Sequence, residues 1–403
     1  MKTVGIICEY NPFHNGHKRQ IELLRDMGYD CIVCVMSGNF TERGELAMFD
    51  KYTRAKCAVL GGADLVLELP FPYCSLSAEG FAQAGVHILA SLGIKDISFG
   101  SECADKTLLF SAAEAICSDD FVKVYSEAQR RGSKGSTKVF FDTLSQVMGK
   151  DVALLSNDIL AIAYIAAIKK LRYDMNIIPI KREGLSYNDK ELVEDKLPSA
   201  SAIRAAITNT CDVGSALNSS VPENVAECLV KQNIAPVNVQ HIGREFLSFF
   251  KLLTPHEILS RAVSRCDGGD SVLEDGCGIC DRLCNSARSA SDFDTFIRSA
   301  YNAKYTDARI NRVALFSLIG VSDSFYRSLP EYTTLLAASD SGRGLLAGIR
   351  KICEFNIVTK PADAPECVQS RISRAADELY ANAMLGGDKT DYFVKCRPYM
   401  MGK

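Results

Sequence analysis

The stretch that decides the fold runs from Thr3 to His17 and has the sequence TVGIICEYNPFHNGH. Its first six residues form a short apolar run that predicts a strand, and Pro12 interrupts the strand because it has no backbone N–H. The apolar spacing of residues 15–27 predicts a helix that begins at Asn15 or Gly16. This stretch is therefore interpreted as a strand, a turn and a helix.

The same alternation continues through the first 100 residues. Three more apolar runs are separated by helical patterns, with the runs at 31–37, 64–69 and 95–99 and the helices at 48–60 and 77–92. Strands that are apolar on both faces indicate a parallel sheet covered by helices on both sides. We expect a doubly wound, Rossmann-like α/β domain. It continues with helices at 157–171 and 197–208 and an edge strand at 175–180 that contains Pro179.

The chain has 403 residues, which is more than one hydrophobic core usually organises. Residues 209–240 show little periodicity and include Pro222 and Pro236, whereas the pattern from His241 to about Tyr380 is almost wholly helical. We therefore expect the α/β domain at 1–208, a connecting segment at 209–240 and a mainly α-helical C-terminal domain at 241–403.

Composition excludes several classes of protein. Hydrophobic residues make up 47% and charged residues 24%, which excludes wholesale disorder, and a net charge of −3 excludes a globally basic nucleic-acid binder. The sequence contains neither a bilayer-length apolar run nor a signal-peptide pattern, so a cytoplasmic protein with reduced cysteines is expected. Cys266, Cys277, Cys280 and Cys284 leave a zinc site open, but the last three have the spacing of a buried helix face, which is favoured.

The strongest candidate site is His14 with His17, in the turn after the first strand. A doubly wound sheet binds its ligand there, and the helix N-terminus offers unpaired N–H groups and partial positive charge to a phosphate. Gly16 would let phosphates approach the backbone. The helix dipole is expected to lower the pKa values of both histidines. The alternatives are capping or core histidines, or a zinc pair that lacks an obvious third ligand.

This motif resembles that of the H-x-G-H nucleotidyltransferase superfamily, whose members act at the α-phosphate of a nucleoside triphosphate. Residues 199–204, SASAIR, are similar to the superfamily's distal phosphate-binding segment. Ser201 and Arg204 share a helix face, and arginine suits phosphate. The resemblance implies that these two residues hold the β- and γ-phosphates. A surface ion pair is the alternative for Arg204.

Further blocks narrow the resemblance to the bacterial tRNA(Met) cytidine acetate ligase family. They cover most of residues 1–205 and continue at 304–312, with SGNFTERG at 37–44, DLVLELP at 64–70, FGSE at 99–102, SNDIL at 156–160, KREG at 181–184 and KYTDARINR at 304–312. The family implies a nucleotidyltransferase-fold ligase. It forms acetyl-adenylate and pyrophosphate from ATP and acetate, then acetylates the wobble cytidine of elongator tRNA(Met) and releases AMP.

The resemblance also assigns residues. His14 and His17 would be catalytic, and ATP would contact Ile7, Cys8, Glu9, Tyr10, Asn11, Pro12, Phe13, His14, Asn15, Gly16, His17, Lys18, Arg19, Gln20, Gly100, Asn157, Arg182, Ser201 and Arg204. Lys304, Arg309 and Arg312 would bind tRNA, with Tyr301 and Tyr305 interleaved. Mg²⁺ is expected with the ATP phosphates, without a dedicated metal site.

Other readings and residues stay open at this point. A nucleotidyltransferase that acts on another small metabolite is the first alternative, and a non-catalytic nucleotide- and RNA-binding protein is the second. Glu9, Glu42, Arg43 and Glu102 lie near the ligand edge of the sheet, where they could contact ligand or form salt bridges between loops. A basic run from Arg130 to Lys138 is either a second RNA contact or a surface turn. The oligomeric state is not predicted.

Overall fold

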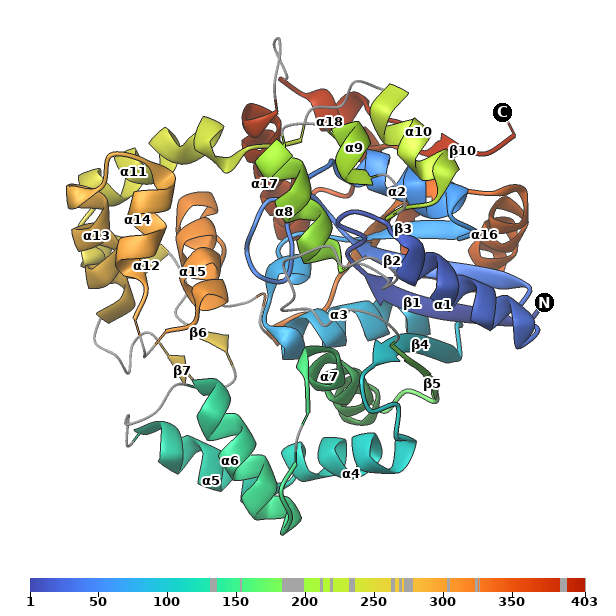
Figure 1. The fold of residues 1–403 in the computed structure, drawn as a ribbon, viewed down its shortest axis with the longest axis horizontal. Coiled ribbons are helices and arrows are strands. Elements are labelled where there is room, and N and C mark those ends of the chain that lie inside the picture. Colours follow the sequence, from blue (N-terminus) through green and yellow to red (C-terminus); the bar gives the residue numbers. More distant parts are fainter. Residues whose placement is uncertain are drawn as a thin grey trace.

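A computed structural model of the protein is shown in Figure 1. It describes residues 1–402 apart from 131–135, 153, 183–198, 211–212, 218–219, 232–235, 262–264, 268–269, 272–277, 303–304, 323–324, 326 and 385–389. Most of the expected loop at Arg130–Lys138, together with Lys304 and Cys277, lies outside the described residues.

The described residues form one large sheet and a small two-stranded one. The strands of the large sheet are β1 (Thr3–Cys8), β2 (Cys31–Ser37), β3 (Leu65–Leu69), β4 (Asp96–Ser101), β5 (Asn176–Lys181), β8 (Tyr332–Ala338), β9 (Asn356–Val358) and β10 (Tyr399–Met400). Their spatial order is β10-β8-β3-β2-β1-β4-β5, with β9 paired to β8. Strands β1 to β5 run parallel, as predicted, and β5 with its Pro179 lies at the edge.

Helices cover both faces of this sheet. On one face Ile6 packs with Leu24 in a core shared with α1 (Asn15–Asp26) and α2 (Lys51–Leu60). On the other, Ile7 and Val35 join Phe81 in a core shared with α3 (Ala78–Ser91) and α7 (Ser156–Leu171). Successive strand residues point to opposite faces, so an unbroken apolar strand can supply both cores. The predicted doubly wound arrangement is confirmed.

The expectation of an almost wholly helical chain from His241 to about Tyr380 is wrong over residues 332–358. Strand β8 pairs antiparallel with β3, so this late segment completes the N-terminal sheet, followed by α16 (Asp340–Ile352) and β9. All seven residues of β8 are buried. A short run buried on both faces has no two-residue alternation, and periodicity cannot separate it from a buried helix. The proposed domain limits themselves stay a prediction.

The remaining helices form groups around the sheet (Figure 1). One group, called here the helical body, consists of α11 (Gly243–Leu252), α12 (Pro255–Arg261), α13 (Gly278–Ser289), α14 (Phe293–Ala300) and α15 (Asp307–Ile319). Helix α4 (Lys106–Ile116) packs against α7, α6 (Ser136–Met148) packs against α4, and α5 (Asp119–Arg130) packs against α6. Other elements are α8 (Ala200–Thr210), α9 (Val213–Leu217), α10 (Glu223–Lys231), α17 (Val368–Ala383), α18 (Tyr392–Lys395), β6 (Arg265–Asp267), β7 (Asp270–Ser271), η1 (Tyr73–Ser75), η2 (Val239–Ile242) and η4 (Pro361–Asp363). Among the described helices, none has both the length and the apolar character that a membrane span requires.

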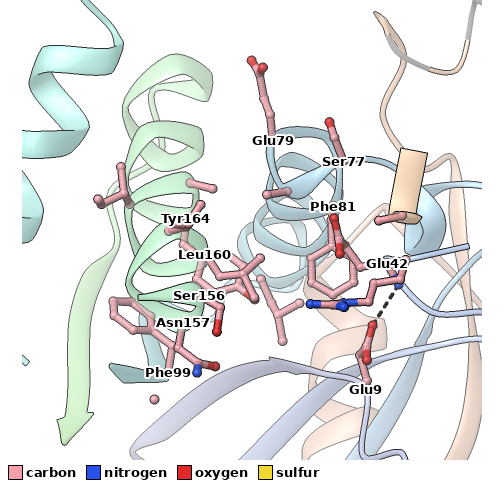
Figure 2. A pocket seen from close by; sticks show the side chains of 18 of the residues that line it. Glu9, Glu42, Ser77, Glu79, Phe81, Phe99, Ser156, Asn157, Leu160 and Tyr164 are labelled. Carbon is pink, nitrogen blue, oxygen red and sulfur yellow. Dashed lines mark hydrogen bonds between the residues drawn. The ribbon is translucent and has the colours of Figure 1, made fainter. Parts of the chain in front are cut away.

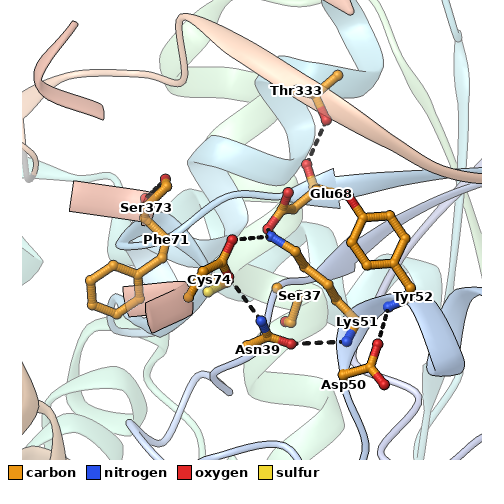
Figure 3. A network of polar contacts seen from close by, with 12 residues as sticks. Ser37, Asn39, Asp50, Lys51, Tyr52, Glu68, Phe71, Cys74, Thr333 and Ser373 are labelled. Carbon is orange, nitrogen blue, oxygen red and sulfur yellow. Dashed lines mark hydrogen bonds and ion pairs between the residues drawn. The ribbon is translucent and has the colours of Figure 1, made fainter. Parts of the chain in front are cut away.

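A buried polar network ties helix α17 to the N-terminal sheet (Figure 3). The Lys51 ammonium lies 2.8 Å from Glu68 Oε1 and 2.7 Å from Asp377 Oδ2, and the Lys51 side chain is 3% exposed. Asn39 Nδ2 donates to Asp377 Oδ1 over 2.8 Å. Burial alone would lower the pKa of Lys51, but the charges of Asp377 and Glu68 raise it above its ordinary value. The lysine is therefore a buried cation shared by two carboxylates.

Replacing Lys51 by methionine should destabilise the protein. The substitution leaves Glu68 and Asp377 in the interior without their cation, and breaking a buried ion pair this way costs about 3–5 kcal/mol. Urea unfolding measures this free energy. The matched control is Lys95→Met, because the Lys95 side chain is 75% exposed and its ion pair with Asp174 is 3.8 Å long; we expect a change within about 0.5 kcal/mol there. Equal stability of the two variants would contradict the role given to Lys51.

Candidate nucleotide-binding site

The two histidines of the first motif cap helix α1 by using their own ring nitrogens. His14 is the N-cap residue, and its Nδ1 accepts the N–H of Gly16 over 3.0 Å. His17 Nδ1 accepts the backbone N–H of His14 over 3.3 Å. The rings stack with centroids 3.7 Å apart and an interplanar angle of 25°. Because Nδ1 is an acceptor in both rings, the proton of each neutral imidazole belongs on Nε2, which leaves an N–H donor on each ring.

The structure gives Gly16 a different role from the expected one. A Cβ atom at this position would lie 2.9 Å from Cε1 and 3.0 Å from Nδ1 of the His14 ring. Any other residue would therefore displace the ring that caps the helix. The glycine is required by the histidine itself, in addition to any approach of a phosphate.

Both histidine pKa values are lowered, as predicted, but the dominant cause is burial. The pKa of His14 is lowered to about 3, first by burial and then by the charges of Arg182 and Arg204. For His17, burial again comes first, followed by His14 and Arg182. Desolvation disfavours the charged ring, and neighbouring cations add to that effect. The site therefore holds neutral imidazoles beside permanent cations.

The loop between β1 and α1 is anchored from several sides. Arg204 Nη1 donates to the Asn11 carbonyl oxygen over 2.8 Å, and Asn11 Oδ1 accepts the N–H of Met48 over 2.8 Å. The buried Arg54 donates to the carbonyl oxygens of Glu9, at 2.5 Å, and of Ser37, at 3.0 Å. These contacts join the ends of two neighbouring strands, so the histidine pair rests on a fixed backbone.

The more distant predicted residues approach the same edge of the sheet. Arg182 follows β5 and packs its Cγ about 3.2 Å from where a Cβ of Gly100 would lie. Asn157, in the first turn of α7, donates through Nδ2 to Glu102 Oε1 over 2.5 Å. Arg204 also donates to Ser201 Oγ over 3.3 Å. Parallel strands end at one edge, which is why segments far apart in sequence meet there.

A pocket of about 1,210 Å³ opens at this edge. The predicted residues that line it are Ile7, Cys8, Glu9, Tyr10, Asn11, His14, Gly16, His17, Arg19, Gln20, Gly100, Asn157, Arg182 and Arg204. The other predicted residues are not in its lining, and these are Pro12, Phe13, Asn15, Lys18 and Ser201. Phe13 is instead fully buried behind the loop. Gly61 leaves the space that the Phe13 ring occupies.

The sequence interpretation missed the apolar wall of the pocket. Phe81 comes from α3 and Phe99 from β4, while Leu160 and Tyr164 come from α7, on the same side of the pocket as Asn157 (Figure 2). Glu9 and Glu42 lie across from them, joined because the Glu42 N–H donates to Glu9 Oε1 over 2.8 Å. The apolar residues were recognisable as core positions of helices and of a strand, but periodicity does not show that such a position borders a cavity.

Two of the predicted tRNA contacts lie in the wall of this pocket, at the end of the helical body. Arg309 and Arg312 are each only 4% exposed and line the pocket. The Arg309 guanidinium lies 5.1 Å from the centre of the Tyr305 ring, and Arg312 pairs with Glu42. These two arginines therefore do not form part of an exposed basic surface. They can contact only a ligand that enters the pocket, and tRNA binding by them stays a prediction.

The cysteines that left a zinc site open divide between described and undescribed positions. Cys280 and Cys284 are buried on α13. Cys277 and the side chain of Cys266 lie outside the described part of the chain. Across the residues that the structure describes, no group of three or more histidine, cysteine or acidic residues has the geometry to hold a metal ion.

Comparison with known proteins agrees with this geometry. The model of the HIGH nucleotidyl transferase family matches residues 1–391. Two proteins named tRNA(Met) cytidine acetate ligase are similar to the chain. The one from Limosilactobacillus reuteri is 33% identical, covering 89% of this chain and 90% of the relative, and the one from Acetivibrio thermocellus is 31% identical, covering 98% and 95%.

Solved structures agree as well. The apo structure of Thermotoga maritima TmcAL has a TM-score of 0.85 and 27% identity, covering 99% of both chains. The same protein bound with alpha-thio ATP has a TM-score of 0.81 and 26% identity, again over 99% of both chains. From the family match and these relatives, the chain is an enzyme that belongs to the tRNA(Met) cytidine acetate ligase family of HIGH nucleotidyl transferases.

Proposed function

We propose that this protein activates acetate with ATP and transfers the acetyl group to the wobble cytidine of elongator tRNA(Met). The products are acetylcytidine in the tRNA, AMP and pyrophosphate. The observation that carries the proposal is the stacked pair His14 and His17, whose Nδ1 atoms are occupied by backbone N–H groups beside Arg182 and Arg204. The names of the curated relatives support the acetate and tRNA substrates.

In the first step, an acetate oxygen attacks the α-phosphorus of ATP. A P–O bond forms, the bond to the bridging oxygen of the β-phosphate breaks, and pyrophosphate leaves with that electron pair. The Nε2–H groups of His14 and His17 are suited to donate to the phosphate oxygens as charge builds on them. Arg204 and Ser201 are proposed to hold the leaving pyrophosphate. We expect Mg²⁺ to arrive with the ATP phosphates.

In the second step, the exocyclic amine of cytidine attacks the acetyl carbonyl carbon. An N–C bond forms, the bond from that carbon to the phosphate oxygen breaks, and AMP leaves while the nitrogen loses a proton. The cytidine has to enter the pocket to reach this carbon, since the histidines line the pocket. We propose that Asn157, Gly100 and the apolar wall at Phe99 receive the adenosine. We place the reaction in the cytoplasm, where ATP and tRNA are available.

Loss of His17 should slow the first step strongly in a folded protein. We expect His17→Ala to slow acetate-dependent pyrophosphate release about 10²- to 10³-fold, because one donor to the developing charge is removed. The assay measures pyrophosphate from ATP and acetate, with and without elongator tRNA(Met), followed by mass analysis of the tRNA nucleosides. His256→Ala is the matched control, since His256 is exposed on α12 and outside the pocket lining.

Each other outcome of this assay has a definite meaning. Full activity in a folded His17→Ala protein would refute the role of the histidine. Pyrophosphate release without acetylcytidine would favour a nucleotidyltransferase with another acceptor. ATP and RNA binding without either product would favour a non-catalytic binding protein.

The buried rings should stay neutral over the physiological range. Because the pKa of His14 is lowered to about 3, protonation occurs only well below pH 5. Nitrogen NMR of a ¹⁵N-histidine sample without ATP should therefore show a neutral His14 ring protonated on Nε2 from pH 8 to pH 5. The same sample unfolded in urea provides the control, because exposed histidines titrate near 6.5. A folded His14 ring that titrates between pH 6 and 7 would contradict the assignment.

A further inference from the structure

A short hairpin, residues 39–47, forms one side of the nucleotide pocket. Its two arms meet at a bridge between Phe40 and Leu46. The Thr41 N–H donates to the Glu45 carbonyl oxygen and the Ala47 N–H to the Asn39 carbonyl oxygen, both over 2.9 Å. The turn is closed by the Gly44 N–H to the Thr41 carbonyl oxygen over 2.9 Å. Glu42, in the turn, and its neighbour Arg43 line the pocket. The position of this turn therefore sets the shape and charge of that side.

The turn lies directly against the backbone of helix α15 in the helical body. Gly44 has φ +71°, which disfavours residues with a side chain. A Cβ there would lie 2.7 Å from the backbone nitrogen and 2.9 Å from the Cα of Arg312. Two backbones that approach this closely leave room only for glycine, so the hairpin and the helix are fitted to each other at Arg312.

The Arg312 side chain holds the same turn through polar contacts. Its Nη1 donates to the Glu42 carbonyl oxygen over 3.1 Å and lies 3.3 Å from Glu42 Oε1. The two side chains are 5% and 24% exposed, so the pair is largely shielded from water. The Glu42 N–H in turn donates to Glu9 Oε1 over 2.8 Å. The contacts thus run from Arg312 on α15 through Glu42 to Glu9, which follows β1 and lines the pocket.

We propose that Arg312 is a positioning residue of the nucleotide pocket, which fixes hairpin 39–47 and through it Glu9. The helical body is then part of the machinery for acetate activation, in addition to any contact it makes with tRNA. A direct grip on the outer surface of tRNA would need an exposed guanidinium, whereas Arg312 is 4% exposed and its Nη1 contacts Glu42. A displacement of about 1 Å in a pocket wall can slow a reaction about 10²-fold, so the contact has a measurable effect on rate.

The test separates a positioning role from a tRNA contact by leaving tRNA out. For Arg312→Ala we expect a kcat about 10- to 100-fold lower in the acetate-dependent exchange of pyrophosphate into ATP. The KM for tRNA in the complete reaction should change less than threefold. A residue that only binds tRNA would give the opposite pattern, with exchange unchanged and the KM for tRNA raised. Arg312→Lys should recover part of the exchange rate, because its ammonium can reach Glu42 but lacks the planar fork.

A double-mutant comparison tests the named partner. If Arg312 acts through Glu42, the effects of the two substitutions should not add. The kcat for pyrophosphate exchange of the variant with both Arg312→Ala and Glu42→Ala should then be at most about threefold below that of the less active single variant. Arg288→Ala is the matched control, because Arg288 is exposed on α13 of the same helical body and outside the pocket lining. We expect it to exchange like the wild type.

A structural measurement keeps this inference distinct from the proposed function on which its activity assay rests. Hydrogen exchange followed by NMR should show the Glu42 and Gly44 amides exchanging about tenfold faster or more in Arg312→Ala, and unchanged in Arg288→Ala. Unchanged amides would overturn the inference whatever the enzyme's reaction is. If the wild type shows no acetate-dependent exchange but Arg312→Ala loosens the hairpin, the proposed function fails and the positioning role stands. Thermal unfolding of each variant verifies that the protein is folded.

Discussion

The candidate nucleotide site depends on two backbone N–H groups at the start of α1, which donate to imidazole nitrogens. In most helices a serine, threonine or aspartate oxygen makes the N-cap bond. Here the cap is His14, and His17 returns the bond from the third helical position. This arrangement fixes each ring's orientation and tautomer without any ligand. It also requires Gly16, since the His14 ring occupies the volume that another side chain would need.

Charge in the pocket is distributed in a way that suits a polyanion. The two rings are kept neutral by burial, while permanent positive charge comes from Arg182 and Arg204. Arg182 follows β5 and Arg204 lies on α8, more than 160 residues after the histidines. Neutral donors need no proton loss or gain between about pH 5 and pH 8, where the arginines are also charged. Arg204 also anchors the loop between β1 and α1, because it donates to the Asn11 carbonyl oxygen. One arginine therefore contributes to both charge and geometry.

Several features could be predicted because their signals are local in the sequence. The H-x-G-H turn, the parallel strands and Pro179 at the sheet edge depend on neighbouring residues, and the structure has them in the expected places. Two other features depend on partners hundreds of residues away. The strand β8 was hidden by burial on both faces, and Arg312 meets Glu42 across 270 positions. The lowering of the histidine pKa values was predicted, but its main cause, desolvation, was not. Spacing along a chain carries little information about such contacts.

The pairing of β8 with β3 also constrains how the chain folds as it is synthesised. β3 ends at Leu69, but the strand that covers its open edge begins at Tyr332, so more than half of the polypeptide is made in between. Until then, the edge of β3 presents unpaired N–H and C=O groups next to apolar side chains, the combination that invites pairing with other chains. The N-terminal sheet cannot reach its final form on the ribosome before the last quarter of the protein emerges. In this fold the last segments made complete the sheet begun by the first.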